Sequence, residues 1–188
     1  MSIDFDLPSR KSGLIISRYH EQNPYSVVVE GITYSIKYDP GDSTSDMFGG
    51  NSNWRGPVWM PINFLIIQSL RRYGEFYGNT LQVEYPNDSG NMMNLEQVAD
   101  ELTKRVISLF TRDSEGNRKS YGEYNWFYQQ PGNEQLLLFY EYFNGNSGRG
   151  LGACHQTGWT ALVVELINWQ KPATAPKKQE EIAPGLPL

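Results

Sequence analysis

Two segments of this sequence are apolar on nearly every face of the helix that each is expected to form, and they constrain the fold most. The first begins at Pro61 and ends near Gly74, and the second runs from Thr157 to Trp169. A helix that is apolar all round has to be buried on more than one side. The other expected helices of a 188-residue chain can supply only some of those neighbours. We therefore expect the chain to be one part of a larger helical toroid.

Capping and periodicity predict the other helices. Asn94 can cap a helix, and Gln97 stands three residues later, at the spacing of a capping box. A single apolar stripe then continues to Phe110. A shorter helix is predicted from Glu134 to about Tyr142. Arg71 and Arg72 would end the first apolar helix, because the helix dipole favours cations at its C-terminus and Gly74 can stop it.

The β content is confined to one predicted hairpin over residues 26–38. A β-branched run, a Glu30-Gly31 break and alternating apolar residues up to Tyr38 are typical of two paired strands. Residues 39–56 and 148–152 are rich in Gly and Pro or Asp, which predicts loops. The predicted fold class is therefore mainly α with a small β-hairpin insertion.

Composition divides the chain and excludes some partners. Residues 1–24 are expected to be irregular, 25–170 to fold, and the Pro-rich, charged residues 171–188 to form a disordered tail. The net charge of −5 and the absence of a basic run argue against nucleic acid and anionic membranes as partners. No apolar run is long enough for a spanning helix. The missing signal sequence and the single Cys154 favour a cytoplasmic location.

Metal and cofactor sites are not expected. The soft ligands are His20, Cys154 and His155, and the adjacent pair cannot close a tetrahedral zinc site. The acidic side chains Asp39, Asp42 and Asp46 lack the spacing of a calcium loop, so a solvated loop is predicted there. The glycines of residues 148–152 lack the Lys-Ser or Lys-Thr of a phosphate loop and are interpreted as a turn.

Aromatic residues leave two interpretations open. The 12 Tyr, 8 Phe and 5 Trp can form a large core, or they can line a cleft with flat walls, as a sugar site requires. Residues 51–63 combine two Trp, one Arg and three Asn, which suit a polyhydroxy ring. Equally, both Trp can be core residues and Arg55 can belong to a structural ion pair.

Glu141 is the carboxylate with the most unusual sequence surroundings. It stands among four aromatic residues, over 139–143. Poor solvation would raise the pKa of its carboxyl group and prepare it to accept a proton. The alternative is an ordinary exposed glutamate.

Three motifs together resemble glycoside hydrolase family 63, which includes processing α-glucosidase I and related bacterial glucosidases. They are NWRGPVW at 53–59 followed by Asn63, YEY at 140–142, and GLGACHQTGWT at 150–160. Their order and spacing resemble the C-terminal part of the family's catalytic domain, over about residues 25–170. The resemblance implies an (α/α)6 toroid, of which this chain would be a portion.

The resemblance also implies an inverting mechanism on α-linked sugars, in an oligosaccharide or a small glycoside. Glu141 matches the general base that activates water. The residues implied to line the pocket are Trp54, Arg55, Gly56, Trp59, Asn63, Tyr140, His155, Gln156 and Trp159. Cys154 departs from the small residue, such as Ser, expected at its position.

The family's general acid would be an Asp upstream of NWRGPVW, in helices that this sequence does not contain. Three hypotheses remain from the sequence. The chain is the base-bearing part of an α-glycosidase that is completed by an upstream fragment, or a carbohydrate-binding module without catalysis, or an orphaned fragment. The loss of general acid catalysis alone would cost about 10²–10⁴-fold in rate.

Overall fold

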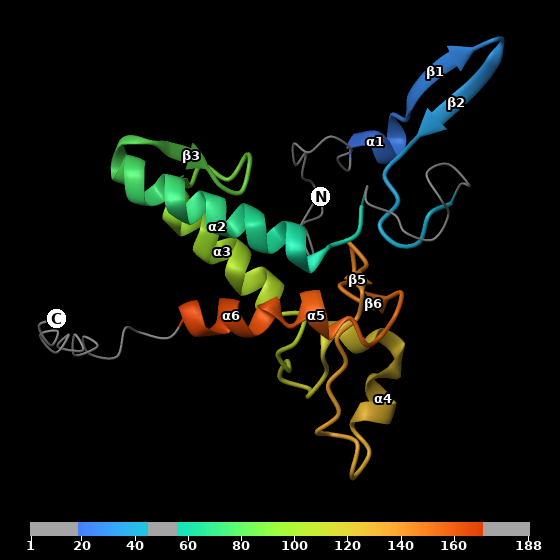
Figure 1. The fold of residues 1–188 in the computed structure, drawn as a ribbon, viewed down its shortest axis with the longest axis vertical. Coiled ribbons are helices and arrows are strands. Elements are labelled where there is room, and N and C mark those ends of the chain that lie inside the picture. The colour runs from blue at the N-terminus through green and yellow to red at the C-terminus, as the bar shows by residue number, and fades with distance from the viewer. Residues whose placement is uncertain (1–18, 45–55, 171–188) are drawn as a thin grey trace, which may run out of the picture.

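The structure, a computed structural model, describes residues 19–44 and 56–170. Its elements are, in chain order, α1 (Tyr19–Gln22), β1 (Tyr25–Val29), β2 (Ile32–Ile36), α2 (Met60–Tyr77), η1 (Gly78–Thr80), β3 (Gln82–Glu84), β4 (Met92–Asn94), α3 (Leu95–Ile107), η2 (Lys119–Tyr124), α4 (Asn125–Tyr128), β5 (Tyr142–Phe143), β6 (Gly150–Leu151), α5 (Thr157–Thr160) and α6 (Leu162–Trp169). The described part is helix-rich, which confirms the predicted mainly α class (Figure 1). It contains the predicted β1–β2 pair and two further two-stranded sheets, β3–β4 and β5–β6, which the sequence does not predict.

The core lies where α2, α3 and α6 meet and continues under β5 (Figure 1). Its fully or nearly fully buried apolar side chains are Val58, Met60, Ile67, Ala99, Val106, Leu109, Phe110, Phe143, Val163 and Leu166. Because Val58 and Phe143 belong to this core, the helices anchor the NWRGPVW motif and the residue that follows YEY. No helix in the described ranges has both the length and the apolar character needed to span a bilayer.

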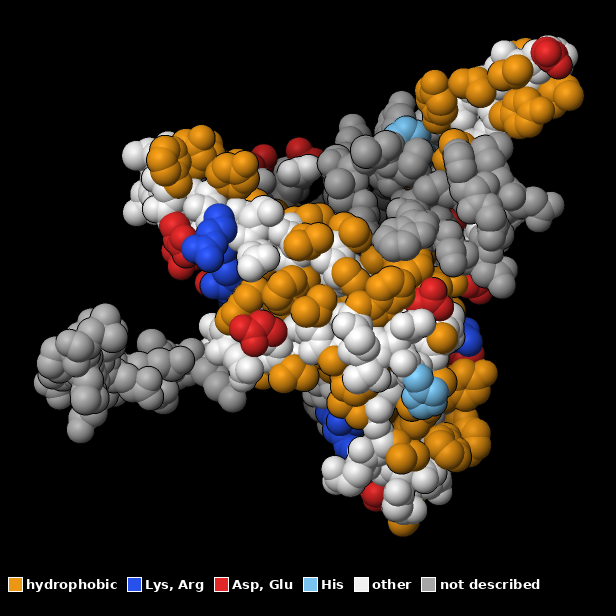
Figure 2. All heavy atoms as spheres, in the orientation of Figure 1, with side chains coloured by type: hydrophobic (Ala, Val, Ile, Leu, Met, Phe, Trp, Pro, Cys, Tyr) orange, Lys and Arg blue, Asp and Glu red, His pale blue; other side chains and the backbone are white. Residues whose placement is uncertain are grey.

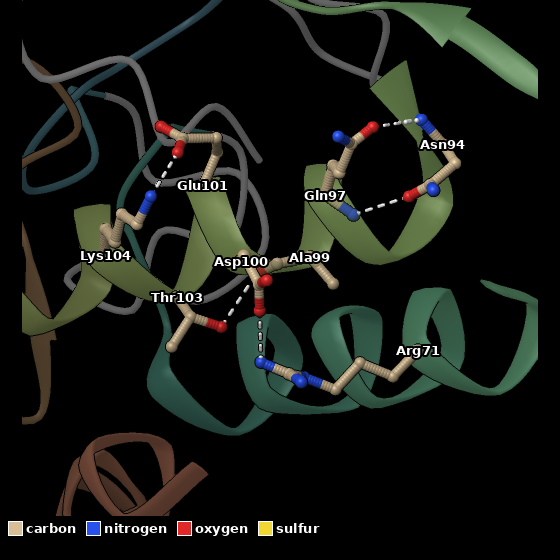
Figure 3. Close-up of polar contacts among 8 residues, drawn as sticks. All are labelled: Arg71, Asn94, Gln97, Ala99, Asp100, Glu101, Thr103 and Lys104. Atoms are coloured by element: carbon tan, nitrogen blue, oxygen red, sulfur yellow. Dashed lines mark hydrogen bonds and ion pairs between the residues drawn. The ribbon is translucent and has the colours of Figure 1, made fainter. Parts of the chain in front are cut away.

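Helix α3 confirms the predicted capping box. The Asn94 side chain accepts a hydrogen bond from the Gln97 amide, and the Gln97 side chain accepts one from the Asn94 amide, both at 2.9 Å (Figure 3). On the face toward α2, Asp100 accepts a 2.6 Å charged hydrogen bond from Arg71 (Figure 3). Arg71 therefore links two helices and does not cap the end of α2.

Helix α2 continues past the predicted stop at Gly74 and ends at Tyr77. A Cβ on Gly74 would lie 2.9 Å from the backbone nitrogen of Glu96, so this glycine permits the close approach of α2 to α3. The chain leaves the helix at Gly78, whose φ is +51°. The prediction of the helix end is wrong because Gly74 has a packing role inside the helix.

The structure differs from two helix predictions, the one over residues 134–142 and the one over residues 157–169. Residues 134–142 do not form a helix; turns up to Gln135 lead into an extended segment that ends in β5. The expected helix from Thr157 to Trp169 is divided into α5 and α6 at Ala161. Thr157 is the first residue of α5, and Gln156 occupies the capping position.

The predicted hairpin forms as β1 and β2, with Val29 paired to Ile32 across a Glu30-Gly31 turn. Both turn residues have positive φ, +50° and +79°, which is the twist that two-residue hairpin turns prefer. In Figure 1 this hairpin extends away from the helices. Of the segment expected to be irregular, residues 19–22 form the single turn α1, and residues 1–18 lie outside the described ranges. The expected tail at 171–188 also lies outside them.

Burial of the apolar helices within this chain is only partial. On α2 the buried residues are Met60, Asn63, Ile67 and Gly74, whereas Leu65 is 57% exposed and Phe76 is 80% exposed. On α6, Val164 and Ile167 are also exposed. Hydrophobic side chains accordingly gather over α2 on the face in Figure 2. The expectation of burial on several sides is not met by the described residues alone.

Candidate active site

The candidate site is built around the short hairpin β5–β6, which carries Glu141 just before its first strand. Val58 and Phe143 exchange two backbone hydrogen bonds, of 2.8 and 2.9 Å. This bridge joins the segment that enters α2 to strand β5. It therefore brings the end of the NWRGPVW motif beside the YEY motif, which is more than 80 residues away in the sequence.

Three glycines, two of them within the motifs and Gly145 between two motifs, allow this close packing. A Cβ on Gly56 would lie 2.0 Å from the carbonyl oxygen of Asp39, and one on Gly145 would lie 2.3 Å from the carbonyl oxygen of Gly56. A Cβ on Gly150 would lie 2.1 Å from the ring of Tyr140. Real Cβ contacts do not occur at such distances, so each position requires glycine in this arrangement.

Glu141 is half-buried and is held by the chain that leaves β6. Its amide donates a 2.7 Å hydrogen bond to the carbonyl oxygen of Ala153, and its Oε2 accepts a 3.1 Å hydrogen bond from the Ala153 amide. A Cβ on Gly152 would lie 2.6 Å from this Oε2, and Gly152 has a φ of +68°. The glycine therefore leaves the space that the carboxylate occupies.

Three aromatic side chains pack on one another at the start of β5, and one of them, Tyr142, directly follows Glu141 in the chain. The rings of Trp59 and Tyr142 stack, with centroids 4.6 Å apart and planes inclined by 26°. Trp159 meets Trp59 edge-on, with centroids 5.7 Å apart. The Nε1 of Trp159 is buried and has no hydrogen-bond acceptor among the described residues. Because Trp59 and Tyr142 are almost fully buried, they belong to the core and do not form an open aromatic wall.

Tyr142 connects this group to the loop after β2. Its hydroxyl donates a 2.5 Å hydrogen bond to Oδ1 of Asp42. Burial raises the pKa of the Tyr142 hydroxyl well above its usual value, and the hydrogen bond to Asp42 and the negative charges of Asp42 and Glu141 raise it further. Tyr142 is therefore a neutral hydrogen-bond donor at physiological pH.

Tyr140, on the other side of Glu141, is held through its backbone. The hydroxyl of Thr160 donates a 2.6 Å hydrogen bond to the Tyr140 carbonyl oxygen. Burial raises the pKa of the Tyr140 hydroxyl, and contact with Tyr128 adds to the shift. Glu141 thus lies between two tyrosines that keep their protons at physiological pH.

The other predicted site residues lie at different depths. Asn63 is fully buried in the first turn of α2, where its side-chain amide donates a 2.7 Å hydrogen bond to the carbonyl oxygen of Trp59. His155 is exposed, and the Gln156 amide donates a 2.9 Å hydrogen bond to the carbonyl oxygen of Phe139. Trp54 and Arg55 lie outside the described residues.

Sequence reasoning missed the parts played by Asp42 and Gly152. The sequence predicts a solvated loop for both Asp39 and Asp42, and this prediction is wrong for Asp39, which is 3% exposed. The sequence predicts a turn at Gly152 and places it in the GLGACHQTGWT motif, but it does not indicate that this glycine makes room for the Glu141 carboxylate. In the described ranges no three His, Cys, Asp or Glu side chains are grouped so that they could hold a metal ion.

Comparison with known proteins gives the following matches. The model of the glycosyl hydrolase family 63 C-terminal domain matches residues 42–169. An uncharacterized protein of Saccharomyces cerevisiae is 49% identical over 81% of this chain and 14% of its own length. A mannosyl-oligosaccharide glucosidase of the same yeast is 31% identical over 65% of this chain and 12% of its own length. Alpha-glucosidase 2 of Arabidopsis thaliana is 25% identical over 63% of this chain and 11% of its own length. This chain therefore spans less than one sixth of each relative.

Proposed function

The chain belongs to glycosyl hydrolase family 63, and we propose that it forms the C-terminal part of a catalytic domain that hydrolyses O-glycosidic bonds of α-linked oligosaccharides. Its relatives include a mannosyl-oligosaccharide glucosidase and an α-glucosidase. A glucoside is therefore the substrate class that we propose. In this function Glu141 is the general base.

The observation that carries the proposal is the fixed carboxylate of Glu141. One oxygen, Oε2, accepts the Ala153 amide, whereas Oε1 has no hydrogen-bond partner in the described part of the chain. An inverting glycosidase needs a base that is oriented yet keeps a lone pair for the attacking water. The Ala153 amide supplies the orientation, and Oε1 is the atom that would take the proton from water.

The remaining predicted residues would bind the sugar around this base. His155 and Gln156 follow Ala153 on the same loop, within reach of a ligand bound beside Glu141. Trp54, Arg55 and Gly56 precede the Val58 bridge, so a pocket on this side would include them. Trp59, Asn63, Tyr140 and Trp159 would support that pocket from below through the contacts described above.

We also propose that residues 25–170 are a portion of an (α/α)6 toroid, completed by an upstream fragment of the same kind of domain. The exposed apolar residues of α2 and α6, such as Leu65, Phe76 and Val164, supply an apolar surface for its helices. The upstream fragment would contribute the general acid. In an inverting site the two carboxyl groups would be about 6.5–9.5 Å apart, which leaves room for a water molecule.

The test is to co-express the chain with the part of its 49% identical yeast relative that precedes the matching region. The assembly should release glucose from an α-glucoside, and NMR of the first product should show the β-anomer. Glu141→Gln keeps the size of the side chain but removes its basicity, so kcat should fall by at least about 10²-fold. Glu165→Gln, an exposed carboxylate on α6, is the matched control.

Two results would contradict the proposal. The first is an assembly that purifies as a stable complex but hydrolyses no α-glucoside. The second is an active assembly in which Glu141→Gln and Glu165→Gln have the same kcat.

A further inference from the structure

The loop between β2 and α2 is fastened to the β5–β6 hairpin by a series of hydrogen bonds. The Tyr38 hydroxyl donates to Oδ1 of Asn146 at 2.9 Å, and the Gly145 amide donates to the carbonyl oxygen of Pro40 at 2.7 Å. The third contact joins Tyr142 to Asp42, 100 residues apart in the sequence. Residues 38–42 therefore run along the hairpin and contact it at every second position.

The Asp42 contact differs from the other two because its partner, the Tyr142 side chain, borders the space that the Glu141 carboxylate occupies. Measured from the position where a Cβ on Gly152 would stand, Oε2 of Glu141 is at 2.6 Å and Cε1 of Tyr142 is at 2.8 Å. The Tyr142 ring and the carboxylate therefore converge on one point above Gly152. A rotation of the ring about its long axis, or a displacement of it, would alter the space available to Oε2.

The Tyr142 ring is fixed at two places. Its face stacks on Trp59, which is fully buried, and its hydroxyl is held by the Asp42 carboxylate. Stacking restrains the plane of the ring but allows it to slide along the indole surface. A hydrogen bond to a charged acceptor is short and roughly twice as strong as a neutral one, so the Asp42 contact stops that sliding.

From this geometry we propose that Asp42 is a positioning residue for Glu141, acting through Tyr142. The inference rests on the proposed function, because positioning matters for catalysis only if Glu141 is the base. Asp42 makes no contact with the reacting atoms. It fixes the Tyr142 ring, the ring bounds the space above Gly152, and the carboxylate in that space stays on the Ala153 amide.

The experiment uses four variants. Asp42→Ala removes the acceptor, and Tyr142→Phe removes only the hydroxyl and keeps the stacked ring. Asp42→Asn keeps a side-chain oxygen that can accept the hydrogen bond, so it should retain most of the positioning that Asp42→Ala loses. Glu75→Ala removes an exposed carboxylate from α2, far along the chain from the hairpin, and controls for the change of net charge.

The first measurement is amide hydrogen exchange of the 188-residue chain, which does not depend on activity. The Ala153 amide reports directly on its hydrogen bond to Glu141. Its exchange should be about tenfold faster in Asp42→Ala and in Tyr142→Phe, close to the parent rate in Asp42→Asn, and unchanged in Glu75→Ala. The amides of Ile67 in α2 and Val106 in α3, whose side chains are fully buried in the core, serve as internal references for global unfolding.

The second measurement is kinetics of the co-expressed assembly. Loss of positioning should lower kcat about tenfold in Asp42→Ala and in Tyr142→Phe while KM changes less than twofold, because only the base is displaced. The double variant should be no worse than either single variant, since both remove the same contact. A residue with a purely structural role would lower the melting temperature without this separation of kcat from KM.

The outcomes separate the two proposals. An inactive assembly with faster Ala153 exchange in Asp42→Ala contradicts the glycosidase function but supports the positioning contact. Active variants with parent kcat and parent Ala153 exchange overturn the role of Asp42. If Asp42→Ala does not fold, Tyr142→Phe decides, and unchanged exchange of Ala153 in that variant overturns the inference.

Discussion

The β1–β2 and β5–β6 hairpins differ in ways that their lengths alone would not suggest. The first pairs five residues on each strand and closes with a favourable two-residue turn, yet almost all of its residues are exposed. The second pairs only two residues on each strand, but Tyr142, Phe143 and Gly150 are buried. The shorter hairpin carries Glu141. The position of this hairpin is therefore fixed by the core beneath it, the Val58 bridge and the 38–42 loop beside it, and not by the hydrogen bonds between its own two strands.

The difference also explains which residue types each hairpin uses. In β1–β2, cross-strand pairs such as Tyr25–Ile36, Val27–Tyr34 and Val29–Ile32 place apolar side chains opposite each other. Those contacts are local and follow from the sequence pattern alone. In β5–β6 the decisive contacts are with segments far away in the sequence, and glycines replace larger residues where those segments approach.

The largest expected effect on stability comes from truncating a buried side chain of the short hairpin. Phe143→Ala should lower the free energy of unfolding by about 4 kcal/mol, because a fully buried aromatic ring is lost and a cavity remains. Val28→Ala in the long hairpin should change it by less than about 0.5 kcal/mol, since Val28 is 69% exposed. Urea unfolding of both variants, followed by Trp fluorescence, measures the contrast. Equal losses would remove the distinction between the hairpins.

A smaller effect should follow from adding a methyl group to one glycine in each hairpin. Gly150→Ala places a Cβ against the Tyr140 ring and should cost about 3 kcal/mol of unfolding free energy through overpacking. Gly31→Ala meets nothing within 4 Å, so it should cost only about 1 kcal/mol for a side chain at a φ of +79°. Thermal and urea unfolding check the order. A larger loss for Gly31→Ala would show that turn strain outweighs packing.

The smallest predicted effect concerns pH and the buried tyrosine of the short hairpin. Burial raises the pKa of Tyr142 in the folded chain, with Asp42 contributing, so the unfolded chain loses this proton first as the pH rises. The stabilisation from the neutral hydroxyl is therefore complete below about pH 10, the unfolded pKa, and declines above it. Unfolding free energies measured from pH 8 to 11 should fall less steeply for Tyr142→Phe. Tyr140→Phe should also make the fall of the unfolding free energy with pH less steep, because burial raises the pKa of Tyr140 as well. An unchanged slope in both variants would contradict the burial of these hydroxyl groups.

Local signals in the sequence predicted those elements whose contacts are themselves local. The Asn94 and Gln97 pair specified the start of α3, because a capping box is completed within four residues. The Glu30-Gly31 turn specified the long hairpin for the same reason. The prediction of a helix over residues 134–142 is wrong, because an apolar run of this length suits a buried extended segment as well as a helix. In the structure, backbone pairing of Phe143 with the distant Val58 decides between the two.

The sequence by itself determined the family and the mainly helical class, since these depend on motifs and periodicity. The role of Glu141 as general base remains a proposal that rests on the family resemblance. Only the tertiary structure decided that Gly74 lies inside a helix, that Gly152 makes room for the Glu141 carboxylate, and that Asp42 reaches Tyr142. The physical reason is the range of the contacts. Propensities and caps act over one or two turns of chain, whereas the space around Glu141 is bounded by segments up to about 100 residues apart, and no local pattern records how closely they approach.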